Sequence, residues 1–376
     1  MKKKILFIFG TRPEAIKIAP VYLALKDHPK FEPLIGLTGQ HPTMAEDILT
    51  FFGIAPDFKM ELQRVNFSLS EFTAKCLEQV DALIDRAQPD LVFVHGDTAS
   101  TFGGGLGAYY HRIPVAHLEA GLRTGLKHSP FPEELMRRMT AVLSDYNFAP
   151  TEAARDALLK ENVSPEHIYV VGNTVIDALM TAVKRLESDA ALRVQITDDL
   201  KEHGLPDDLG EMILITGHRR ENFGDRFEEI CNSIRDLARQ HPEYNFIYPV
   251  HLNPNVQEPV KKILDGIENV YLIPPVNYAH FVYLMNAAHF ILTDSGGIQE
   301  EAPSLGKPVL IMRDATERPE VIAAGCARLV GTDRIVSAAN ELIANPALYK
   351  QMSQVKNPYG DGQASAQIVK ILQDVL

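Results

Sequence analysis

The chain has 376 residues, of which 45% are hydrophobic, and a formal net charge of −12 at pH 7. This length favours about two domains. The negative charge argues against binding to nucleic acid or to an acidic membrane, because both need a broad basic surface. No apolar run reaches the roughly 18 residues that cross a bilayer, and the five apolar residues after the basic start favour a first strand over a secretory signal. We therefore expect a cytoplasmic protein without membrane insertion.

Short apolar runs alternate with amphipathic helical stretches along the chain. Residues 70–87 show apolar side chains at helical spacing, and the polar stretch 188–210 follows the expected crossing between domains. The alternation favours parallel sheets covered by helices on both faces. Strands are predicted at 4–9, 33–38, 90–95, 114–119, 147–149 and 168–171 in the first half, and at 212–216, 245–250, 270–273, 290–293, 308–312 and 328–330 in the second.

The two halves repeat one plan. We therefore predict an α/β protein of two Rossmann-like, doubly wound domains facing each other across a cleft, with the first domain over 1–170 and the second over 171–357. Sheets of this kind bind ligands beyond the carboxyl ends of their strands. The residues that follow each strand are therefore the candidates for a functional site.

The first strand leads through Gly10 into a predicted helix with Pro13 near its start. Free backbone N–H groups at such a helix start attract an anion, and Arg12 and Lys17 add positive charge beside them. A plain strand–helix turn with surface charges is the alternative. Neither a dinucleotide-binding glycine motif nor a P-loop is present.

Three carboxylates follow neighbouring strands or open the next helix: Asp97, Glu119 and Glu133. Crowded carboxylates raise one another's pKa, which suits proton transfer near neutral pH. Two simpler interpretations remain, since Asp97 could cap the next helix and Glu133 could answer the helix dipole. A metal site of His95, Asp97, His117 and Glu119 is a further alternative, although the helical His-x-x-x-His pattern is missing.

The first strand of the second half ends in His218, Arg219 and Arg220. A histidine and two arginines at a strand end favour binding of a phosphate. A solvated basic turn is the alternative interpretation.

A second anion site is predicted after the strand at 290–293. Ser295 can cap the following helix, and Gly296 and Gly297 let the backbone approach a diphosphate closely. Glu301 lies further into that helix, where its carboxylate could bind both hydroxyls of a ribose. Arg318 follows the next strand and is a further anion contact, while a bare tight turn is the alternative for this segment.

Segments spread over the whole chain resemble those of the non-hydrolysing UDP-N-acetylglucosamine 2-epimerases. They occur in the same order from end to end, which makes the resemblance more specific than any single motif. The segments are GTRPEAIK at 10–17, VHGDT at 94–98, EAGLRTG at 119–125, FPEE at 131–134, GHRRE at 217–221, YPVHLNP at 248–254, DSGGIQEEAPSLGKP at 294–308 and NPYGDG at 357–362.

The resemblance implies a GT-B-like fold, a homodimer, and a last helix at 358–376 that returns to the first domain. It also implies interconversion of UDP-N-acetylglucosamine and UDP-N-acetylmannosamine for bacterial surface polysaccharides, without a cofactor or metal. In this family's pattern the catalytic residues are Asp97, Glu119, Glu133 and His218. The nucleotide contacts are Arg12, Lys17, Phe281, Ser295, Gly296, Gly297, Glu301 and Arg318.

Some positions depart from the family's pattern. The helix after Asp97 contains four glycines (Gly103, Gly104, Gly105 and Gly107), so it is expected to be either loose or very closely packed. Several relatives use a second substrate molecule as an activator. The matching positions are Gln40, His41 and Arg219, but Thr43 replaces a usual glutamine, and activation therefore stays open.

The resemblance suggests a mechanism. The hydrogen on carbon 2 is not next to a carbonyl, so elimination of UDP across carbons 1 and 2 offers the easier route, through a glycal to which UDP adds back. Proton carriers on both faces of the sugar are then needed, and the carboxylate trio can supply them. A hydrolysing epimerase, a glycosyltransferase of the same fold and a non-catalytic sensor are the rival functions.

Overall fold

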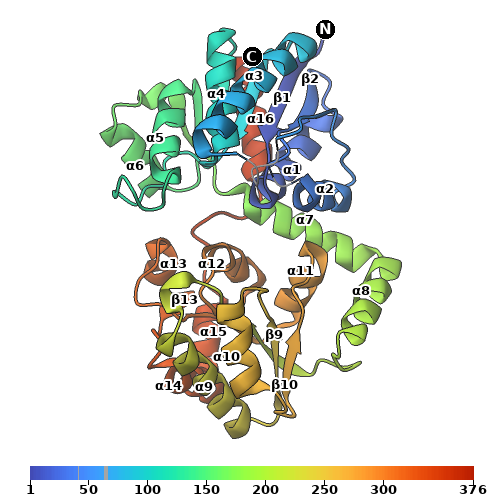
Figure 1. The fold of residues 1–376 in the computed structure, drawn as a ribbon, viewed down its shortest axis with the longest axis vertical. Helices are drawn as coiled ribbons and strands as arrows, with labels where there is room; N and C mark the ends of the chain where they lie inside the picture. The colour runs from blue at the N-terminus through green and yellow to red at the C-terminus, as the bar shows by residue number, and fades with distance from the viewer. Residues whose placement is uncertain (41, 63–66) are drawn as a thin grey trace. The chain divides into compact units, whose positions relative to one another are not determined.

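The computed structural model describes residues 1–40, 42–62 and 67–376. The chain forms two compact units: unit 1 is Met1–Ala178 with Tyr359–Leu376, and unit 2 is Leu179–Pro358. Each unit is built on one sheet of parallel strands with helices around it (Figure 1). The prediction of an α/β protein with two doubly wound sheets is therefore confirmed.

The sheet of unit 1 has the strand order β3-β2-β1-β4-β5-β6-β7. Its strands are β1 (Lys3–Phe9), β2 (Phe31–Leu37), β3 (Phe58–Lys59), β4 (Leu91–His95), β5 (Val115–Leu118), β6 (Tyr146–Ala149) and β7 (Ile168–Val170). Its helices are α1 (Arg12–Lys26), α2 (Pro42–Phe51), α3 (Leu69–Ala87), α4 (Ala99–Tyr110), α5 (Glu133–Leu143), α6 (Glu152–Lys160) and α16 (Ala364–Val375), with α7 (Thr174–Ser188) at the boundary of the units.

An inner strand of this sheet is β1, which lies between β2 and β4 and whose residues Ile5 to Phe9 are all fully buried. A strand covered by helices on both faces needs such a continuous apolar run. The chain order reverses between β1 and β4, so the loops that follow these two strands flank the switch point where ligands of such sheets bind. Two-residue β3 was not predicted.

The glycines of α4 allow close packing against α3 and the sheet. A Cβ added at Gly103 would lie 2.8 Å from Cys76 Sγ, and one at Gly107 would lie 2.5 Å from Val80 Cγ1. Real Cβ atoms do not approach neighbours this closely, so larger residues would push the two helices apart. Of the two expectations for this helix, close packing is the one that the structure bears out.

Unit 2 repeats the plan with the strand order β10-β9-β8-β11-β12-β13, so its switch point lies between β8 and β11. The strands are β8 (Glu211–Thr216), β9 (Tyr244–Pro249), β10 (Val270–Ile273), β11 (Phe290–Thr293), β12 (Val309–Ile311) and β13 (Ala327–Leu329). The helices are α8 (Ala190–Glu202), α9 (Asp225–Gln240), α10 (Pro254–Leu264), α11 (Tyr278–Ala287), α12 (Gly296–Glu301), α13 (Pro319–Ala324), α14 (Ile335–Ala344) and α15 (Pro346–Ser353).

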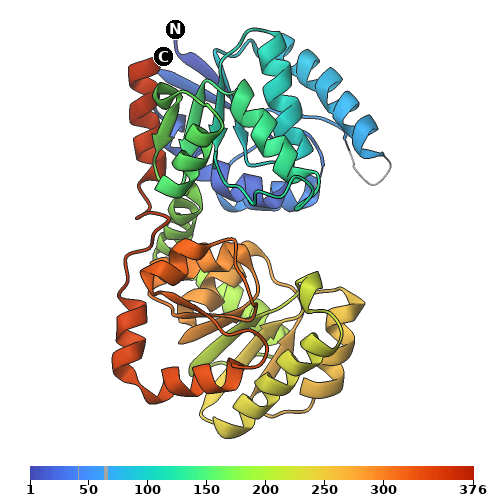
Figure 2. The same ribbon diagram turned by 90° about the vertical axis from the view of Figure 1, so that its left-hand side faces the viewer.

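The last helix, α16, belongs to unit 1, where it packs against α1 (Figure 2). The carboxylate of Asp177 in α7 accepts hydrogen bonds from the backbone N–H groups of Ala364 (3.3 Å) and Ser365 (2.7 Å). These donors have no partner within the helix, so Asp177 caps α16 and joins it to α7. Within 188–210, where the sequence indicated only a polar stretch, the chain forms α8.

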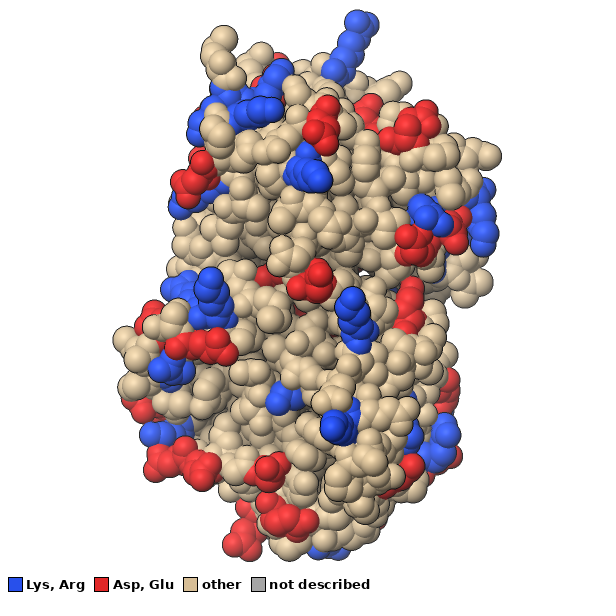
Figure 3. All heavy atoms as spheres, turned by 180° about the vertical axis from the view of Figure 1, so that it is seen from behind, with Lys and Arg blue, Asp and Glu red and all other residues tan. Residues whose placement is uncertain are grey.

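Acidic and basic side chains are interspersed on the face shown in Figure 3, and neither sign forms a broad patch there. Within the described ranges, no helix combines the length and the hydropathy that crossing a membrane demands.

Candidate active site

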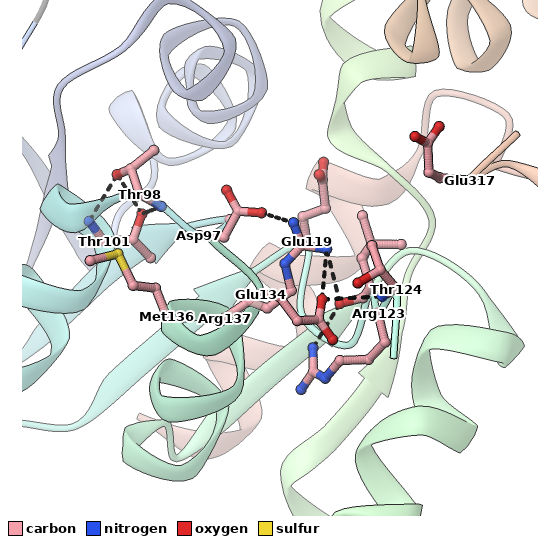
Figure 4. A network of polar contacts seen from close by, with 12 residues as sticks. Asp97, Thr98, Thr101, Glu119, Arg123, Thr124, Glu134, Met136, Arg137 and Glu317 are labelled. Carbon is pink, nitrogen blue, oxygen red and sulfur yellow. Dashed lines mark hydrogen bonds and ion pairs between the residues drawn. The ribbon is translucent and has the colours of Figure 1, made fainter. Parts of the chain in front are cut away.

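The loop after β4 places Asp97 at the carboxyl edge of the unit 1 sheet. Thr98, and not Asp97, caps α4, because Thr98 Oγ1 accepts a hydrogen bond from the backbone N–H of Thr101 at 3.1 Å. The helix-cap interpretation of Asp97 is therefore wrong. Its carboxylate instead forms an ion pair with Arg137 of α5, and the two side chains point toward each other in Figure 4.

Asp97 is partly buried and lies among other charges. Desolvation raises its pKa above the usual value, the guanidinium of Arg137 opposes this rise, and the carboxylates of Glu119 and Glu133 add to it. Both other members of the predicted carboxylate group therefore lie close enough to Asp97 to act on it electrostatically. An aspartate with a raised pKa can exchange a proton closer to neutral pH.

Glu119 follows β5 in a conformation that is rare for a residue with a side chain. Its φ is +62°, in the left-handed region, which costs on the order of 1–3 kcal/mol and persists where the surroundings enforce it. Its carboxylate pairs with Lys17, accepts a hydrogen bond from Asn173 Nδ2 at 3.1 Å and lies 3.4 Å from His95 Nε2. Strain of this kind concentrates at functional sites.

The same partners keep Glu119 ionised. Burial alone would raise its pKa, but the positive charge of Lys17 and the contact with His95 outweigh burial and hold the pKa well below the usual value. Asp97 and Glu119 therefore have shifts of opposite sign on one sheet edge. Such a pair suits a site that needs one carboxylate to exchange a proton and another to stay charged.

Glu133 is the first residue of α5 and is half-buried. It does stand in the first turn, as the helix-dipole interpretation requires, and its charge also reaches Asp97. The next residue, Glu134, is fully buried and accepts hydrogen bonds from the backbone N–H groups of Thr124 (3.1 Å) and Gly125 (3.2 Å). Glu134 thereby holds the loop before α5 in place.

The two residues before α1 use their backbone N–H groups within the protein. The carboxylate of Glu14 accepts hydrogen bonds from the backbone N–H groups of Gly10 (2.9 Å) and Thr11 (2.7 Å), so these donors are already used. Arg12, half-buried, is the first residue of this helix. Lys17 lies one to two turns further on, where it forms the ion pair with Glu119.

His117 uses one ring nitrogen for a contact with the backbone of unit 1. It is fully buried, its Nε2 lies 2.7 Å from the carbonyl oxygen of Gly96, and burial lowers its pKa to about 3. Within residues 1–40, 42–62 and 67–376, no group of three or more histidine, cysteine and acidic side chains is arranged to hold a metal ion.

The switch point of unit 2 is organised around Asp294, a fully buried residue directly after β11. Its Oδ2 accepts hydrogen bonds from the backbone N–H groups of His218 (2.9 Å) and Arg219 (2.8 Å) and from Asn222 Nδ2 (3.3 Å). Its Oδ1 lies 3.6 Å from His218 Nδ1. Asp294 thus fixes the turn that presents His218.

The ring of His218 stacks on that of His251, with ring centroids 5.4 Å apart. Burial lowers the pKa of His218, the neighbouring His251 and Arg219 add to this, and Asp294 opposes it. The imidazole is therefore mostly neutral at pH 7, so that it can donate one hydrogen bond and accept another.

The first two residues of α12 are Gly296 and Gly297, and Ser295 precedes them. Ser295 occupies the N-cap position but its side chain makes no cap hydrogen bond, so the capping role predicted for it is wrong. A Cβ added at Gly297 would meet only Glu301 Oε2, at 3.9 Å, and one at Gly296 only Arg219 Nη2, at 3.5 Å. Neither glycine has a positive φ. The protein's own packing therefore does not require glycine at either position, whereas the close approach of a ligand would.

The other predicted contacts of unit 2 lie around this turn and on α11. Glu301 is the buried last residue of α12, and Arg318, at the start of α13, forms an ion pair with Glu300. Phe281 is half-buried on α11.

Of the activator positions, Gln40 is buried in unit 1, where its Oε1 accepts a hydrogen bond from Ser100 Oγ at 3.0 Å. Thr43 is exposed near the start of α2, and Arg219 belongs to unit 2. His41 lies outside the described residues. Activation by a second substrate molecule stays a prediction.

Three contributors to the site were not singled out from the sequence as site residues: Arg137, Asp294 and His251. A signal existed for Arg137, since it stands four residues after Glu133 and residues at this spacing share a helix face. Asp294 immediately precedes the predicted glycine turn, where a buried carboxylate after a strand can bond the backbone of the neighbouring loop.

Two Rossmann-like sheets, each with ionisable side chains around its switch point, define a GT-B-like α/β protein. A solved sucrose-phosphate synthase from Thermosynechococcus elongatus shares this fold at 14% identity, with a TM-score of 0.61 and coverage of 100% of this chain and 99% of that one. The family model described as UDP-N-acetylglucosamine 2-epimerase matches residues 23–373, and the chain belongs to this family of isomerases.

Individual relatives match over nearly their whole length. The chain is 50% identical to the UDP-N-acetylglucosamine 2-epimerase of Escherichia coli (strain K12), over 99% of this chain and 98% of that protein. The crystal structure of UDP-GlcNAc 2-epimerase from Neisseria meningitidis bound to UDP-GlcNAc is 46% identical with a TM-score of 0.89, covering 99% and 100% of the two chains. That of Methanocaldococcus jannaschii in complex with UDP-GlcNAc and UDP is 32% identical with a TM-score of 0.79, covering 100% of both.

Proposed function

We propose that this protein interconverts UDP-N-acetylglucosamine and UDP-N-acetylmannosamine by inverting carbon 2 of the sugar. The observation that carries the proposal is the pair of carboxylates at one sheet edge whose pKa values move in opposite directions, upward for Asp97 and downward for Glu119. The membership of the family and the UDP-GlcNAc bound to the 46% identical relative support the choice of substrate.

The chemistry follows from the acidity of the substrate. A hydrogen on carbon 2 without a neighbouring carbonyl is very weakly acidic, so its removal needs a coupled departure of the diphosphate from carbon 1. A carboxylate accepts the proton as the carbon–oxygen bond to UDP breaks, which leaves a glycal with a double bond between carbons 1 and 2. UDP then adds back to carbon 1 while a proton returns to carbon 2 on the opposite face, and the trio of Asp97, Glu119 and Glu133 supplies the carriers.

The residues of unit 2 act on the nucleotide. The open backbone at Gly296 and Gly297 approaches the diphosphate together with Ser295, and Glu301 binds the ribose hydroxyls. His218 stabilises the negative charge that develops on the leaving diphosphate, helped by Arg12 and Arg318, and Phe281 lies beside the uracil. Lys17 acts near the diphosphate while paired with Glu119.

The wider assignments stay part of the proposal. The protein acts as a homodimer, needs neither cofactor nor metal, and supplies UDP-N-acetylmannosamine for bacterial surface polysaccharides. A cytoplasmic location, where nucleotide sugars are made, is expected with that role.

The decisive experiment incubates the purified chain with UDP-N-acetylglucosamine alone in deuterated water, with and without a chelator, and identifies the products by NMR. UDP-N-acetylmannosamine carrying deuterium at carbon 2, formed equally with chelator, supports the proposal. Free N-acetylmannosamine with UDP would instead indicate a hydrolysing epimerase. Turnover only after addition of an acceptor would indicate a glycosyltransferase, and binding without turnover a sensor. An epimerised product without deuterium would rule out the elimination route.

A matched pair of variants connects this activity to the site. Asp97→Asn should stop epimerisation and leave UDP binding unchanged within about twofold, because an amide cannot accept the proton. Asp90→Asn makes the same chemical change just before β4, at the opposite end of the strand, where Asp90 pairs with Lys3 on the surface. It should leave turnover intact. Equal loss in both variants would refute the assignment of Asp97.

A further inference from the structure

The positively charged side chain of Arg137 contacts Asp97 from a different element of the fold. It lies on α5, and its Nη2 donates to Asp97 Oδ2 on the loop after β4, 40 residues earlier in the chain. We propose that Arg137 is a positioning residue that holds the carboxylate of Asp97 in place and ionised for proton transfer at carbon 2. This inference rests on the proposed function.

The guanidinium is itself fixed by buried partners. Its Nη1 donates to the carbonyl oxygen of Leu122 at 3.4 Å and lies 3.7 Å from Glu134 Oε2, while the side chain of Arg137 is only 14% exposed. Glu134 in turn bonds the backbone of Thr124 and Gly125. Figure 4 shows this chain of contacts running from the loop through Glu134 and Arg137 to Asp97. A planar guanidinium held at several points is well suited to orienting one carboxylate.

The arrangement is not the one that stability alone would favour. Arg137 Nε is buried and has no hydrogen-bond partner among the residues that the structure describes. A buried donor without a partner lowers stability, and such a donor in a native structure calls for an explanation, of which a role in the reaction is one.

The charges around Asp97 show what the contact does. Glu119 from the end of β5 and Glu133 from α5 both raise the pKa of Asp97, as does desolvation, while His95 from β4 lowers it. Arg137 is the largest opposing influence. Without this guanidinium the pKa of Asp97 would rise further, so at a given pH a smaller fraction of Asp97 would be ionised and able to accept a proton. Arg137 and Glu133 also share a face of α5. One helix therefore places both of these charged groups near Asp97.

The neighbouring arginine provides a matched control. Arg138 stands on the same helix, but its side chain is 45% exposed and its Nε bonds Glu161 Oε1 at 2.8 Å, away from Asp97. Arg137→Met and Arg138→Met therefore remove the same charge from adjacent positions. Arg137→Lys keeps the charge but loses the planar fork.

The experiment measures kcat and KM for UDP-N-acetylglucosamine across pH for these variants and the wild type. We expect Arg137→Met to lower kcat by about 30-fold or more, within the range of about 10² to 10⁴ that general acid–base catalysis contributes. KM should change by less than about threefold, and the acidic limb of the kcat profile should move to higher pH. Arg137→Lys should recover about tenfold of the lost kcat and bring the acidic limb of the kcat profile back to the wild-type pH. Arg138→Met should match the wild type within about twofold.

A double-variant cycle separates positioning from a purely structural effect. If Arg137 acts through Asp97, Arg137→Met should cost no further activity in an Asp97→Asn background, compared as the residual turnover of the single and double variants at high enzyme concentration. Additive losses, an unmoved acidic limb, or a raised KM with unchanged kcat would each overturn the inference.

A ¹³C NMR titration of the Asp97 carboxyl, assigned with Asp97→Asn, tests the same contact without turnover. Arg137→Lys, which keeps the positive charge, should leave the pKa of Asp97 near the wild-type value, and Arg137→Met should raise it. An unchanged titration in Arg137→Met would overturn the inference even if the chain did not epimerise its proposed substrate. Conversely, if the wild type epimerises the substrate and substitution of Arg137 changes neither the kinetics nor the titration, the proposed function still holds and only this inference fails.

Discussion

Two glycines of α4 should respond in opposite ways to the same substitution. A Cβ at Gly105 would lie 3.8 Å from Val115 Cγ1, which is ordinary van der Waals contact. A Cβ at Gly107 would lie 2.5 Å from Val80 Cγ1, where something must shift. Both positions are inside the helix, where alanine is favoured over glycine. Each substitution should therefore add about 1 kcal/mol to the free energy of unfolding through the backbone alone.

The packing around each position decides whether the alanine stabilises or destabilises unit 1. At Gly105 no clash opposes the gain, so Gly105→Ala should stabilise unit 1 by about 1 kcal/mol. At Gly107 the extra methyl must separate α4 from the stiff, β-branched Val80 of α3, which costs about 2–3 kcal/mol at the upper end of overpacking penalties. Gly107→Ala should therefore destabilise unit 1 by about 1–2 kcal/mol.

The assay is guanidinium chloride unfolding followed by far-UV circular dichroism, with hydrogen exchange at the amides of α4 to locate the effect in unit 1. The two variants should move the midpoint in opposite directions without changing the slope. The reasoning fails if Gly107→Ala is as stable as Gly105→Ala, because the close approach of α3 to α4 would then not be what requires glycine.

Two further predictions concern binding and pH. Glu301→Ala should weaken UDP binding at least about tenfold by calorimetry, since a charge-assisted hydrogen bond contributes about 1.5–3 kcal/mol. The control Glu258→Ala, at an exposed position, should leave the affinity unchanged. Equal affinities of the two variants would show that Glu301 does not bind the ribose. His117 should make the fold sensitive to acid, because burial lowers its folded pKa to about 3 while the unfolded value is about 6.5. Below pH ~6.5 the unfolded chain binds a proton that the folded protein excludes, so stability should fall by about 1.4 kcal/mol per pH unit down to about pH 3. His117→Gln should flatten this slope in unfolding midpoints measured between pH 7 and 5, and parallel slopes would contradict the assignment.

The order of strands and helices was predictable because it depends on local patterns. The run Ile5 to Phe9 is apolar without a break, and it forms a buried inner strand of its sheet. The apolar spacing in 70–87 appears as α3, whose N-terminus is closed by Ser68 and Glu71 in a capping box. Both features depend on residues within a few positions of one another, where sequence patterns are informative.

The candidate site was predictable for a similar reason. Parallel strands bring their carboxyl ends to one edge, so Asp97, Glu119 and Glu133 could be grouped from chain order alone. The same rule places His218 and Ser295 together, because β8 and β11 are neighbours. Chain order cannot tell what each side chain contacts, however: the carboxylate of Glu14 bonds the backbone N–H groups of Gly10 and Thr11, a contact that was not predicted.

The sequence by itself determined the fold class, the family and the edges of the sheets where reactive side chains gather. Only the tertiary structure decided how each carboxylate behaves. The pair of Lys17 with Glu119 joins residues 102 positions apart, and that of Arg137 with Asp97 joins residues 40 apart. Protonation depends on burial and on charges within a few ångströms, and the folded chain sets these distances through contacts that no local pattern records.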